Sequence, residues 1–571
     1  MTEAEAPTWQ EQALHICAVR DASMATIKAE LPDMSGDKHI ARVIGVPRLR
    51  LTERDVHITE SAVEDLVRQL AAGEVTAKEA ALAFLRRAVI TNCIYELLPD
   101  RALGRAQELD DYLANNGQPI GPLHGLPISV KEHISVSGCE NTAGFVGWAG
   151  RRKDEDASIV KILLDAGAVL YARTTEPQGL VSNAPFTNLY WDTQSNITGV
   201  TANPHNRALT CGGSSGGEAA LLAFTARDMA QNQRPNKILG GSIRLPAAHC
   251  GLYGFKPSSG RLPLMGLEAY CIGSDTIAPS IGPLSPSLGG IKLFMDTVLM
   301  SEPWHNDPSL LPVPWASQAA QIHQQEKLPL VVGVMWTDGI VQPAPPIKRA
   351  LLEVVDKLKS TPDVQIIDWQ PFKQNEALEI LVSLSLLQKR LYSPDGGRAF
   401  MENLALSGEP ILPLPAWTVR DQPGIEALDI KGLWYWTRKR DQFRYSYLKG
   451  TARLALVPNM DVILCPAYPM PAPVHGTSRY WGYTSLWNLL DYPAITFPVT
   501  RVDREKDGQA PGYIPKNDSD RWCYDSYDVQ KQKDAPVSLQ LVARRSKDAE
   551  LLQAAEKIQR EIGLPFVDCL A

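Results

Sequence analysis

The fold is decided by residues 211–256, which read CGGSSGGEAALLAFTARDMAQNQRPNKILGGSIRLPAAHCGLYGFK. Two serine sites in this stretch are flanked by glycines. Ser214 and Ser215 stand between two Gly-Gly pairs, and Ser242 follows a third. Glycine lets the main chain turn sharply and lets other groups approach it closely. One such stretch alone is more often a simple turn, but the repeated pattern favours a serine nucleophile beside free backbone N–H groups.

A third segment lies upstream, from Gly121 to His133, and reads GPLHGLPISVKEH. Its apolar run from Leu126 to Val130 predicts a buried strand that ends at Lys131. An amine at the end of a buried strand loses solvation, which favours its neutral form and makes it a candidate base. A lone lysine at a strand end is usually just solvated, so this interpretation depends on the two serine segments.

Together the three segments resemble the amidase signature family, and more closely its fungal acetamidase-like branch. The resemblance runs from about residue 50 to the C-terminus, with HGLPISVKEH, NPHNRALTCGGSSGGEAALL and GGSIRLPAAHCGLYGFKPS in the family's order. It implies an α/β fold in which a mixed, mainly parallel twisted β-sheet is covered by helices on both faces. We expect an N-terminal arm over residues 1–50 and an amidase signature domain over 51–571, with its core motifs at about 121–260.

The resemblance implies a Ser–cis-Ser–Lys catalytic triad. The matching residues are Ser242 as nucleophile, Ser214 as the bridging serine after a cis peptide bond, and Lys131 as base. Neutral Lys131 would take a proton relayed through Ser214. Ser242 would then attack an amide carbonyl and form an acyl-enzyme that water hydrolyses.

Backbone N–H groups just before the nucleophile would bind the oxyanion of the intermediate. The expected donors are Ile238, Leu239, Gly240 and Gly241. Losing one such donor costs about 10²–10³ in turnover, so the geometry of this loop decides activity. Ser215 is expected to hydrogen-bond within the site. Arg244 is expected to fix the loop through a salt bridge rather than to contact the substrate.

Two segments depart from the family's pattern. Residues 224–237 are polar and charged, and they lack the alternation of a strand leading to the nucleophile. Residues 191–197 look inserted. The two segments are either genuine changes of this lineage, or retained intron or misjoined exon sequence. Sequencing the transcript distinguishes these two explanations. Two hypotheses about function follow: an amidase that hydrolyses small or medium carboxylic amides to carboxylate and ammonia, or a catalytically impaired homologue with a binding or scaffold role.

Two further hypotheses are weaker. A conventional Ser-His-Asp hydrolase would use His133, His205 or His249 as its base, but each is expected to be structural. No G-x-S-x-G elbow surrounds Ser242, and no clear strand leads into the one that fits around Ser215. An amidotransferase subunit that feeds ammonia to a charged tRNA shares the motifs, but the acetamidase branch is the better match.

Composition limits the partners. The chain has 571 residues, of which 44% are hydrophobic, and a net charge of −7. The negative net charge disfavours nucleic acid and anionic membranes as main partners. Nine scattered cysteines without metal-ligand spacing indicate reduced thiols, and no metal or cofactor is expected. The acidic, polar start MTEAEAPTWQEQ and the lack of a bilayer-length apolar run predict a cytoplasmic protein without a membrane span. The expected partner is a small-molecule amide. Family members are often dimers, so a homodimer stays open.

Hydrophobic periodicity predicts alternating helices and strands. Thr59 is expected to N-cap one helix, Thr76 and Glu79 to form a capping box for the next, and Asp156 to cap a third. Residues 501–536 are expected to form a solvated insertion between two core strands. The expected strands are 126–130, 168–172, 252–256, 330–336, 365–369, 462–465, 494–498 and 537–542.

Overall fold

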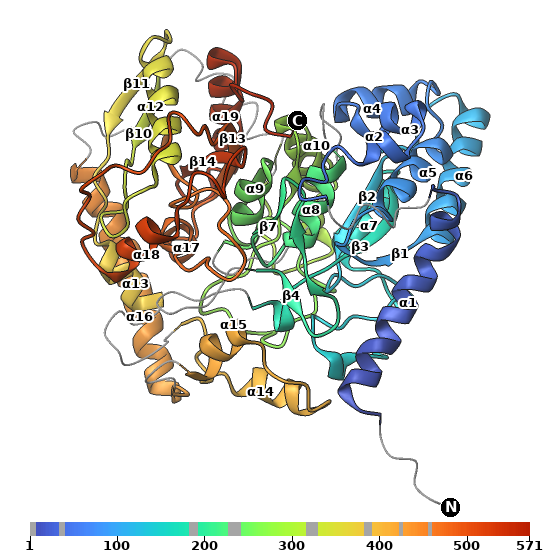
Figure 1. The fold of residues 1–571 in the computed structure, drawn as a ribbon, viewed down its shortest axis with the longest axis horizontal. Helices are drawn as coiled ribbons and strands as arrows, with labels where there is room; N and C mark the ends of the chain where they lie inside the picture. The colour runs from blue at the N-terminus through green and yellow to red at the C-terminus, as the bar shows by residue number, and fades with distance from the viewer. Residues whose placement is uncertain are drawn as a thin grey trace, which may run out of the picture.

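The structure is a computed structural model that describes residues 7–32, 40–181, 192–225, 241–313, 315, 329–381, 391–421, 426–454 and 460–570. Within these residues two main β-sheets carry the fold (Figure 1). The larger sheet has the strand order β11 (Val364–Asp368), β10 (Leu330–Val334), β12 (Val462–Pro466), β14 (Pro536–Ala543), β13 (Ala494–Arg501), β8 (Tyr253–Lys256) and β9 (Leu284–Ser285). The smaller sheet has the order β1 (Ile94–Leu97), β3 (Val169–Thr174) and β2 (Pro127–Lys131).

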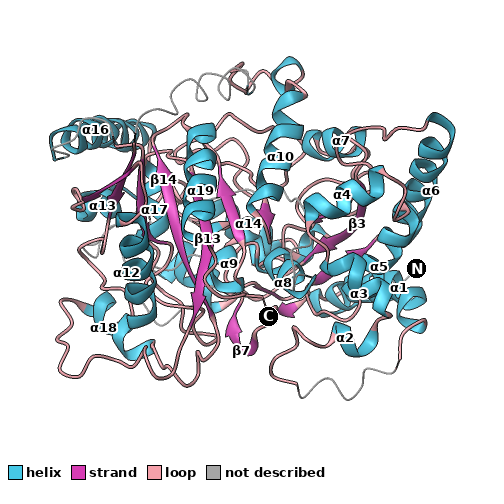
Figure 2. Ribbon diagram, turned by 90° about the horizontal axis from the view of Figure 1, so that it is seen from above, coloured by secondary structure: helices cyan, strands magenta, loops and turns pink. Residues whose placement is uncertain are grey.

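Helices surround both sheets (Figure 2). Their bounds are α1 (Trp9–Ala29), α2 (Pro47–Arg50), α3 (Glu53–Glu60), α4 (Val63–Ala71), α5 (Ala77–Ala88), α6 (Pro99–Asn116), α7 (Ser158–Asp165), α8 (Gly216–Thr225), α9 (Arg244–Cys250), α10 (Leu288–Met300), α12 (Pro345–Lys359), α13 (Gln374–Leu381), α14 (Arg398–Ala405), α15 (Pro413–Ala416), α16 (Ile430–Leu454), α17 (Gly482–Leu489), α18 (Asp518–Ser526) and α19 (Asp548–Ile562). Helices α9, α12 and α19 pack on β14, whereas α5, α6 and α8 pack on β3. In the described part of the chain, no helix is both long and apolar enough to cross a membrane.

The strand directions are mixed, which confirms the predicted α/β class with a mixed sheet. Parallel pairing joins β2 to β3, and β10 to both β11 and β12. The pairs β1–β3, β12–β14, β14–β13, β13–β8 and β8–β9 are antiparallel. The expectation of mainly parallel strands is therefore corrected. It holds for β2–β3 and β10–β11, where α7 and α12 form the crossovers, but an apolar run shows burial and not the direction of the neighbouring strand.

One predicted helix cap is confirmed and two are wrong. Thr76 and Glu79 form the capping box at the start of α5, with reciprocal hydrogen bonds of 3.1 and 3.0 Å. Thr59 lies inside α3, where its Oγ1 donates to the backbone carbonyl four residues earlier, and α4 begins without a side-chain cap. Asp156 does not cap α7. Its two carboxylate oxygens instead accept hydrogen bonds from Arg101 Nη2, at 2.9 and 2.7 Å.

The expected solvated insertion at residues 501–536 contains ordered, buried structure. It includes α18, whose Trp522 and Cys523 side chains are buried. Its Asp507 is fully buried and accepts a hydrogen bond from Arg349 Nε of α12 at 2.7 Å. The charged neighbours in the sequence concealed these few apolar anchors, so the segment packs on the main domain instead of standing in solvent.

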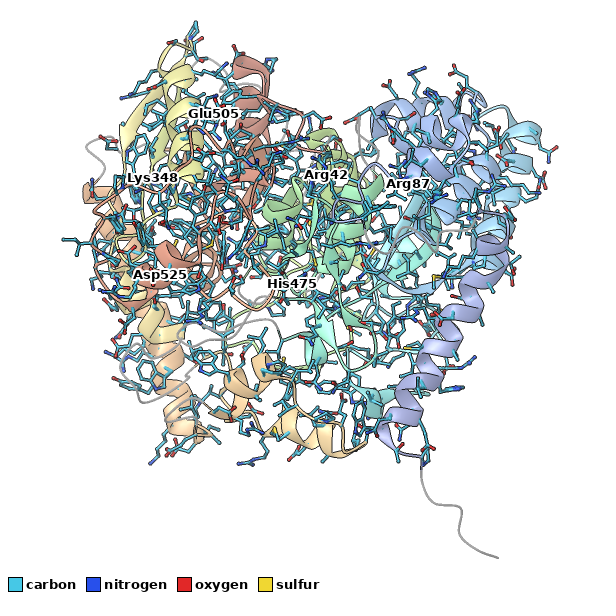
Figure 3. All side chains as sticks on the ribbon, in the orientation of Figure 1. Arg42, Arg87, Lys348, His475, Glu505 and Asp525 are labelled. Carbon is cyan, nitrogen blue, oxygen red and sulfur yellow. The ribbon has the colours of Figure 1, made fainter. Side chains whose placement is uncertain are left out.

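A buried arginine links α8 to the helices beside it. Figure 3 labels Arg87, which belongs to α5. Its side chain donates two hydrogen bonds to the Phe224 carbonyl oxygen, at 2.9 and 2.8 Å. It also donates to Thr59 Oγ1 at 2.7 Å and to Glu60 Oε1 at 3.2 Å. Burial lowers the pKa of Arg87 to about 10. Since α8 follows the Ser214–Ser215 loop directly, Arg87 fixes the far end of the helix that carries this loop.

Candidate active site

Lys131 is the last residue of β2, and every residue of this strand is buried. The lysine side chain is 0% exposed. Parallel pairing places Lys131 opposite Thr174 at the end of β3, so the amine lies at the carboxyl edge of the smaller sheet. Its Nζ atom is 2.7 Å from Ser214 Oγ. The sequence-based prediction of a buried strand ending in this lysine is confirmed.

The Ser214–Ser215 loop turns tightly into α8. The peptide bond between Gly213 and Ser214 is cis, as the resemblance implied. Close packing explains the glycines that follow. A Cβ atom on Gly216 would lie 2.3 Å from Thr193 Oγ1, and one on Gly217 would lie 2.4 Å from the Thr175 carbonyl oxygen. Glycine is therefore required where the first turn of α8 meets its neighbours.

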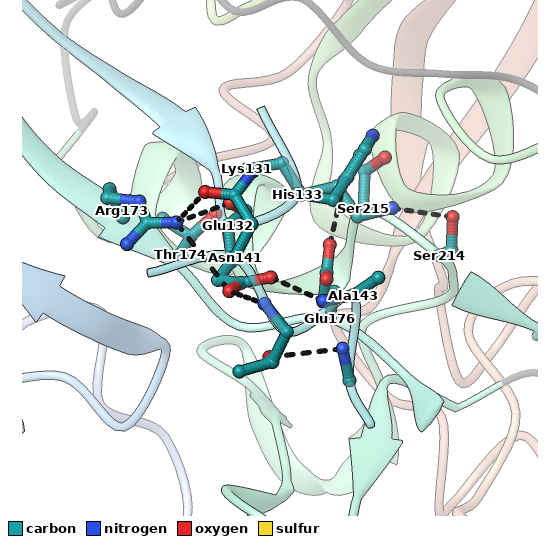
Figure 4. Close-up of polar contacts among 12 residues, drawn as sticks. Lys131, Glu132, His133, Asn141, Ala143, Arg173, Thr174, Glu176, Ser214 and Ser215 are labelled. Carbon is teal, nitrogen blue, oxygen red and sulfur yellow. Dashed lines mark hydrogen bonds and ion pairs between the residues drawn. The ribbon is translucent and has the colours of Figure 1, made fainter. Parts of the chain in front are cut away.

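Ser242 follows Gly241, whose φ of +146° lies outside the range that side chains favour. The Ser242 side chain is almost completely buried, and its Oγ lies 2.5 Å from Ser214 Oγ. The backbone N–H of Ser214 also donates to Ser242 Oγ at 3.3 Å. Ser215 Oγ completes the set at 3.2 Å. The structure thus brings together all four predicted side chains of the site, and Figure 4 shows Lys131 beside the Ser214–Ser215 loop.

Burial changes the titration of Lys131. Loss of solvent lowers its pKa to about 8, because the charged ammonium is disfavoured in a dry site. The buried carboxylates of Glu176, Glu218 and Glu132 act in the opposite direction. A pKa near 8 leaves about a tenth of the amine neutral at pH 7, a larger fraction than an exposed lysine offers. The amine is therefore suited to accept a proton near neutral pH.

The predicted oxyanion loop is only partly described. Ile238, Leu239 and Gly240 lie outside the described residues, as does most of the unusual 224–237 segment. Gly241 is described and buried. Its carbonyl oxygen accepts the Leu245 N–H at 2.9 Å, which ties the loop to the beginning of α9.

The unusual 191–197 segment borders the site. Thr193 is fully buried and its Oγ1 donates to the Gly212 carbonyl oxygen at 2.9 Å. Thr193 Oγ1 also accepts the Gly216 N–H at 3.1 Å. Thr193 therefore bridges the two ends of the serine loop. The described part of this segment, from residue 192, therefore packs against the serine loop.

Arg244 fixes the nucleophile loop, but it forms no salt bridge with any of the residues that the structure describes, contrary to the prediction. Its guanidinium is fully buried and donates to the Thr484 carbonyl oxygen at 2.9 Å, to Gln540 Oε1 at 3.3 Å and to Asn488 Oδ1. These acceptors are neutral, and burial lowers the pKa of Arg244 to about 9. The positioning role was predicted, but its partners come from α17 and β14, distant elements that no local pattern reveals.

The three histidines considered as bases have other contacts. His205 Nε2 lies 3.1 Å from the Cys250 carbonyl oxygen, and the His249 ring packs edge-on against Tyr468. Burial lowers the pKa of each to about 3, so both are neutral. His133 contacts Glu176. Among the described residues, no cluster of His, Cys, Asp or Glu could hold a metal ion.

Likeness to known proteins extends over almost the whole chain. The Amidase family profile matches residues 79–552. The chain belongs to the amidase family. A protein of Schizosaccharomyces pombe is 39% identical to this amidase over 565 residues, or 96% of this chain and 98% of that protein. The acetamidase of Emericella nidulans is 34% identical over 523 residues, covering 90% and 91% of the two chains. A solved structure of fatty acid amide hydrolase superposes with a TM-score of 0.85 at 30% identity, covering 97% and 95%.

The family establishes this amidase as an amide hydrolase, and it confirms the resemblance on which the site residues were chosen. The acidic residues around Lys131 were not predicted from the sequence. Glu176 lies two residues beyond the end of β3, and Glu218 lies in the first turn of α8. The pairing of Lys131 with Thr174 at the ends of β2 and β3 brings residues 131–133 near 174–176, and no local sequence pattern indicates this register.

Proposed function

We propose that the chain hydrolyses carboxylic amides to a carboxylate and ammonia or an amine, with Ser242 as nucleophile, Ser214 as relay and Lys131 as base. One observation carries this proposal: two consecutive short contacts join Lys131 Nζ to Ser214 Oγ and Ser214 Oγ to Ser242 Oγ, at 2.7 and 2.5 Å. A serine hydroxyl needs a base to become a strong nucleophile. Here the Ser214 hydroxyl lies between the Ser242 hydroxyl and the Lys131 amine, so the proton passes through Ser214.

The reaction begins when neutral Lys131 accepts the hydroxyl proton of Ser214. Ser214 takes the proton of Ser242, whose Oγ forms a bond to the amide carbonyl carbon. The tetrahedral oxyanion is bound by backbone N–H groups, for which we propose Ile238 to Gly241. The protonated relay then gives its proton to the leaving nitrogen as the C–N bond breaks, and an acyl-enzyme ester on Ser242 remains. Water attacks this ester with the same base, which releases the carboxylate and restores the serine.

Small to medium amides are the proposed substrates. The acetamidase relative indicates a short acyl group, whereas the fatty acid amide hydrolase likeness extends the range toward longer acyl chains. The intact contacts among Lys131, Ser214 and Ser242 argue against the alternative of a catalytically impaired homologue. Dimerisation and a cytoplasmic location stay predictions.

Ammonia release from a panel of aliphatic and aromatic amides tests this function. The wild-type protein should turn over at least one amide, and Ser242→Ala should reduce the rate to background. Added hydroxylamine should be converted to the hydroxamate of the same acyl group, because it intercepts an acyl-enzyme. Unchanged turnover in Ser242→Ala would exclude this nucleophile, and turnover without hydroxamate would exclude a trappable acyl-enzyme.

A further inference from the structure

A side chain from another segment holds the loop that carries the two serines before α8. Thr193 is fully buried, and its Oγ1 donates to the Gly212 carbonyl oxygen at 2.9 Å and accepts the Gly216 N–H at 3.1 Å. A hydroxyl group can donate and accept at the same time. This hydroxyl therefore joins the two ends of the loop, and Ser214 and Ser215 lie between these two fixed points.

The two contacts of Thr193 leave the loop hydroxyls available for catalysis. Gly216 is the first residue of α8, and the N–H groups in the first turn of a helix have no partner within the helix. Serine side chains beside such a turn commonly bond these N–H groups themselves. Here Thr193 accepts the Gly216 N–H instead. The hydroxyl oxygens of Ser214 and Ser215 face Ser242 Oγ, at 2.5 and 3.2 Å.

The main chain around Thr193 sets the direction of its side chain. Thr193 precedes strand β4 (Gln194–Ser195), which pairs antiparallel with β5 (Gly199–Val200). The Thr193 carbonyl oxygen accepts the Thr201 N–H at 2.9 Å, which extends this pairing by one more hydrogen bond. The hairpin therefore fixes the backbone from which the Thr193 hydroxyl reaches the serine loop.

Asp192 anchors the same segment to a loop from the C-terminal part of the chain. Its Oδ1 lies 3.0 Å from His475 Nδ1, and its Oδ2 accepts the Gly476 N–H at 3.0 Å. The other ring nitrogen of His475, Nε2, lies 3.1 Å from the Arg207 carbonyl oxygen. Both ring nitrogens thus face acceptor atoms, and the doubly protonated imidazolium satisfies both contacts. Each carboxylate oxygen of Asp192 then has a donor.

The other end of the segment is anchored as well. The Asn196 side chain donates to Glu409 Oε2 at 2.8 Å. The Cys17 thiol of α1 donates to the Ile197 carbonyl oxygen at 3.0 Å. The segment is therefore bonded at both ends to distant parts of the chain, and the hydroxyl that holds the serine loop has a firm support.

We propose that Thr193 is a positioning residue that keeps the relay serine within reach of the nucleophile, and that Asp192 anchors it to residues 475–476. The proposal rests on the catalytic roles proposed for Ser214 and Ser242. Thr193 acts through the backbone of the serine loop and not by contact with the reacting atoms. A displacement of about 1 Å in a catalytic arrangement can cost about 10²-fold in rate, even when its cause lies away from the chemistry.

The first test is Thr193→Val, which keeps the shape of the side chain and removes the hydroxyl group. The kcat for an amide should fall by about 10–10²-fold while KM stays near the wild-type value, because the loop and not the substrate loses contacts. The rate at which a fluorophosphonate labels Ser242 should fall by a similar factor. An unchanged kcat in folded Thr193→Val, or a rise of KM alone, would overturn the proposal.

A rescue variant and a matched control separate positioning from stability. Thr193→Ser restores the hydroxyl group and should return kcat to near the wild-type value. Ser258 is the matched position, because its buried Oγ donates to Asp548 Oδ2 at 2.8 Å and accepts the Ser546 N–H at 2.9 Å. Ser258→Ala should lower the midpoint of urea unfolding and leave kcat unchanged. An equal loss of kcat in Ser258→Ala, or no rescue by Thr193→Ser, would overturn the proposal.

Ser242→Ala and Ser214→Ala test the proposed function separately. If both variants keep the wild-type turnover, the catalytic roles are wrongly assigned and the proposal for Thr193 is overturned with them. If both lose turnover but folded Thr193→Val does not, only the role of Thr193 is overturned.

A Thr193→Val protein that fails to fold leaves a second route. Thr193→Cys keeps a small side chain, and its thiol is a weaker donor and acceptor than a hydroxyl group, so kcat should still fall. Asp192→Ala keeps the Thr193 hydroxyl and removes its anchor, and it should lower kcat by a smaller factor without changing KM. Wild-type kcat in folded Thr193→Cys would overturn the role of Thr193, and wild-type kcat in folded Asp192→Ala would overturn the anchor.

Discussion

Lys131 and Ser214 are 83 positions apart in the chain, yet the Nζ of one lies 2.7 Å from the Oγ of the other. The contact joins the end of a buried strand to the loop before a buried helix. The packing of these two elements therefore positions both side chains. Ser242 then reaches the same hydroxyl from the other side at 2.5 Å. The first predictions test this chain of three groups.

Replacing Lys131 by Met should remove the base. Amide kcat/KM should fall by about 10²–10⁴, the usual contribution of a general base. In the wild type the ammonium form dominates below a pKa of about 8, so kcat/KM should decline as the pH falls through that value. Lys131→Met should lose this acid limb. The measurement is a pH profile of ammonia release at low substrate concentration.

Lys256→Met is the matched control for Lys131→Met. Lys256 is also buried, and burial lowers its pKa to about 8 as well. Its Nζ donates to the carbonyl oxygens of Pro257 and Tyr492 instead of contacting the catalytic serines. This variant should lower the midpoint of urea unfolding and keep the wild-type acid limb. Loss of the limb in both variants would mean that it reports folding rather than a base.

The two loop serines should differ in importance. Ser214 contacts both Lys131 and Ser242, whereas Ser215 contacts Ser242 alone at 3.2 Å. Ser214→Ala should therefore reduce kcat by about 10²–10⁴, because it interrupts proton transfer. Ser215→Ala removes one orienting hydrogen bond and should reduce kcat by about tenfold. Steady-state kinetics of the two variants gives the comparison, and equal losses would argue against a relay through Ser214 alone.

The sequence predicted the parts of the site that local chemistry dictates. Gly216, Gly217 and Gly241 stand where an added Cβ atom would lie 2.3, 2.4 and 2.7 Å from a neighbouring atom, so packing in the site requires glycines that the sequence shows directly. Strand β2 was predicted because the apolar run from Leu126 to Val130 leads to Lys131, and the structure buries all five residues of the strand. Helix α5 was predicted from its capping box and its apolar periodicity, since one face of such a helix must be apolar.

The remaining features depend on contacts between distant segments. Antiparallel β12–β14–β13 pairing leaves no mark on the composition of its strands. Asp156 has the residue type of a helix cap, but Arg101 competes for it from another helix. The buried contact between His133 and Glu176 requires the register between β2 and β3. Such features follow from the assembled sheet and not from any window of sequence.

Gly217→Ala should destabilise the protein at the serine loop. A Cβ atom there would lie 2.4 Å from the carbonyl oxygen of Thr175 and 2.7 Å from its nitrogen, and the backbone cannot yield as a side chain can. The expected loss is about 1–3 kcal/mol of unfolding free energy, together with lower activity. Gly104→Ala is the control, because Gly104 is an exposed position of α6 with nothing within 4 Å of its missing Cβ. It should stabilise the helix by about 1 kcal/mol. Urea unfolding of both variants checks the opposite signs.

Arg87→Met should show that α8 is held at its far end. The change leaves the Phe224 carbonyl oxygen and the Thr59 hydroxyl without their buried donor, which should cost about 3 kcal/mol of unfolding free energy. The neighbouring Arg86 pairs with Glu30 and Asp55 but is partly exposed, so Arg86→Met should cost about 1 kcal/mol or less. Chemical denaturation measures both values, and hydrogen exchange should localise the Arg87→Met loss to α8. Equal costs for the two variants would contradict this anchoring. The two arginines are adjacent in one helix and have the same helix propensity and charge, so only their contacts differ.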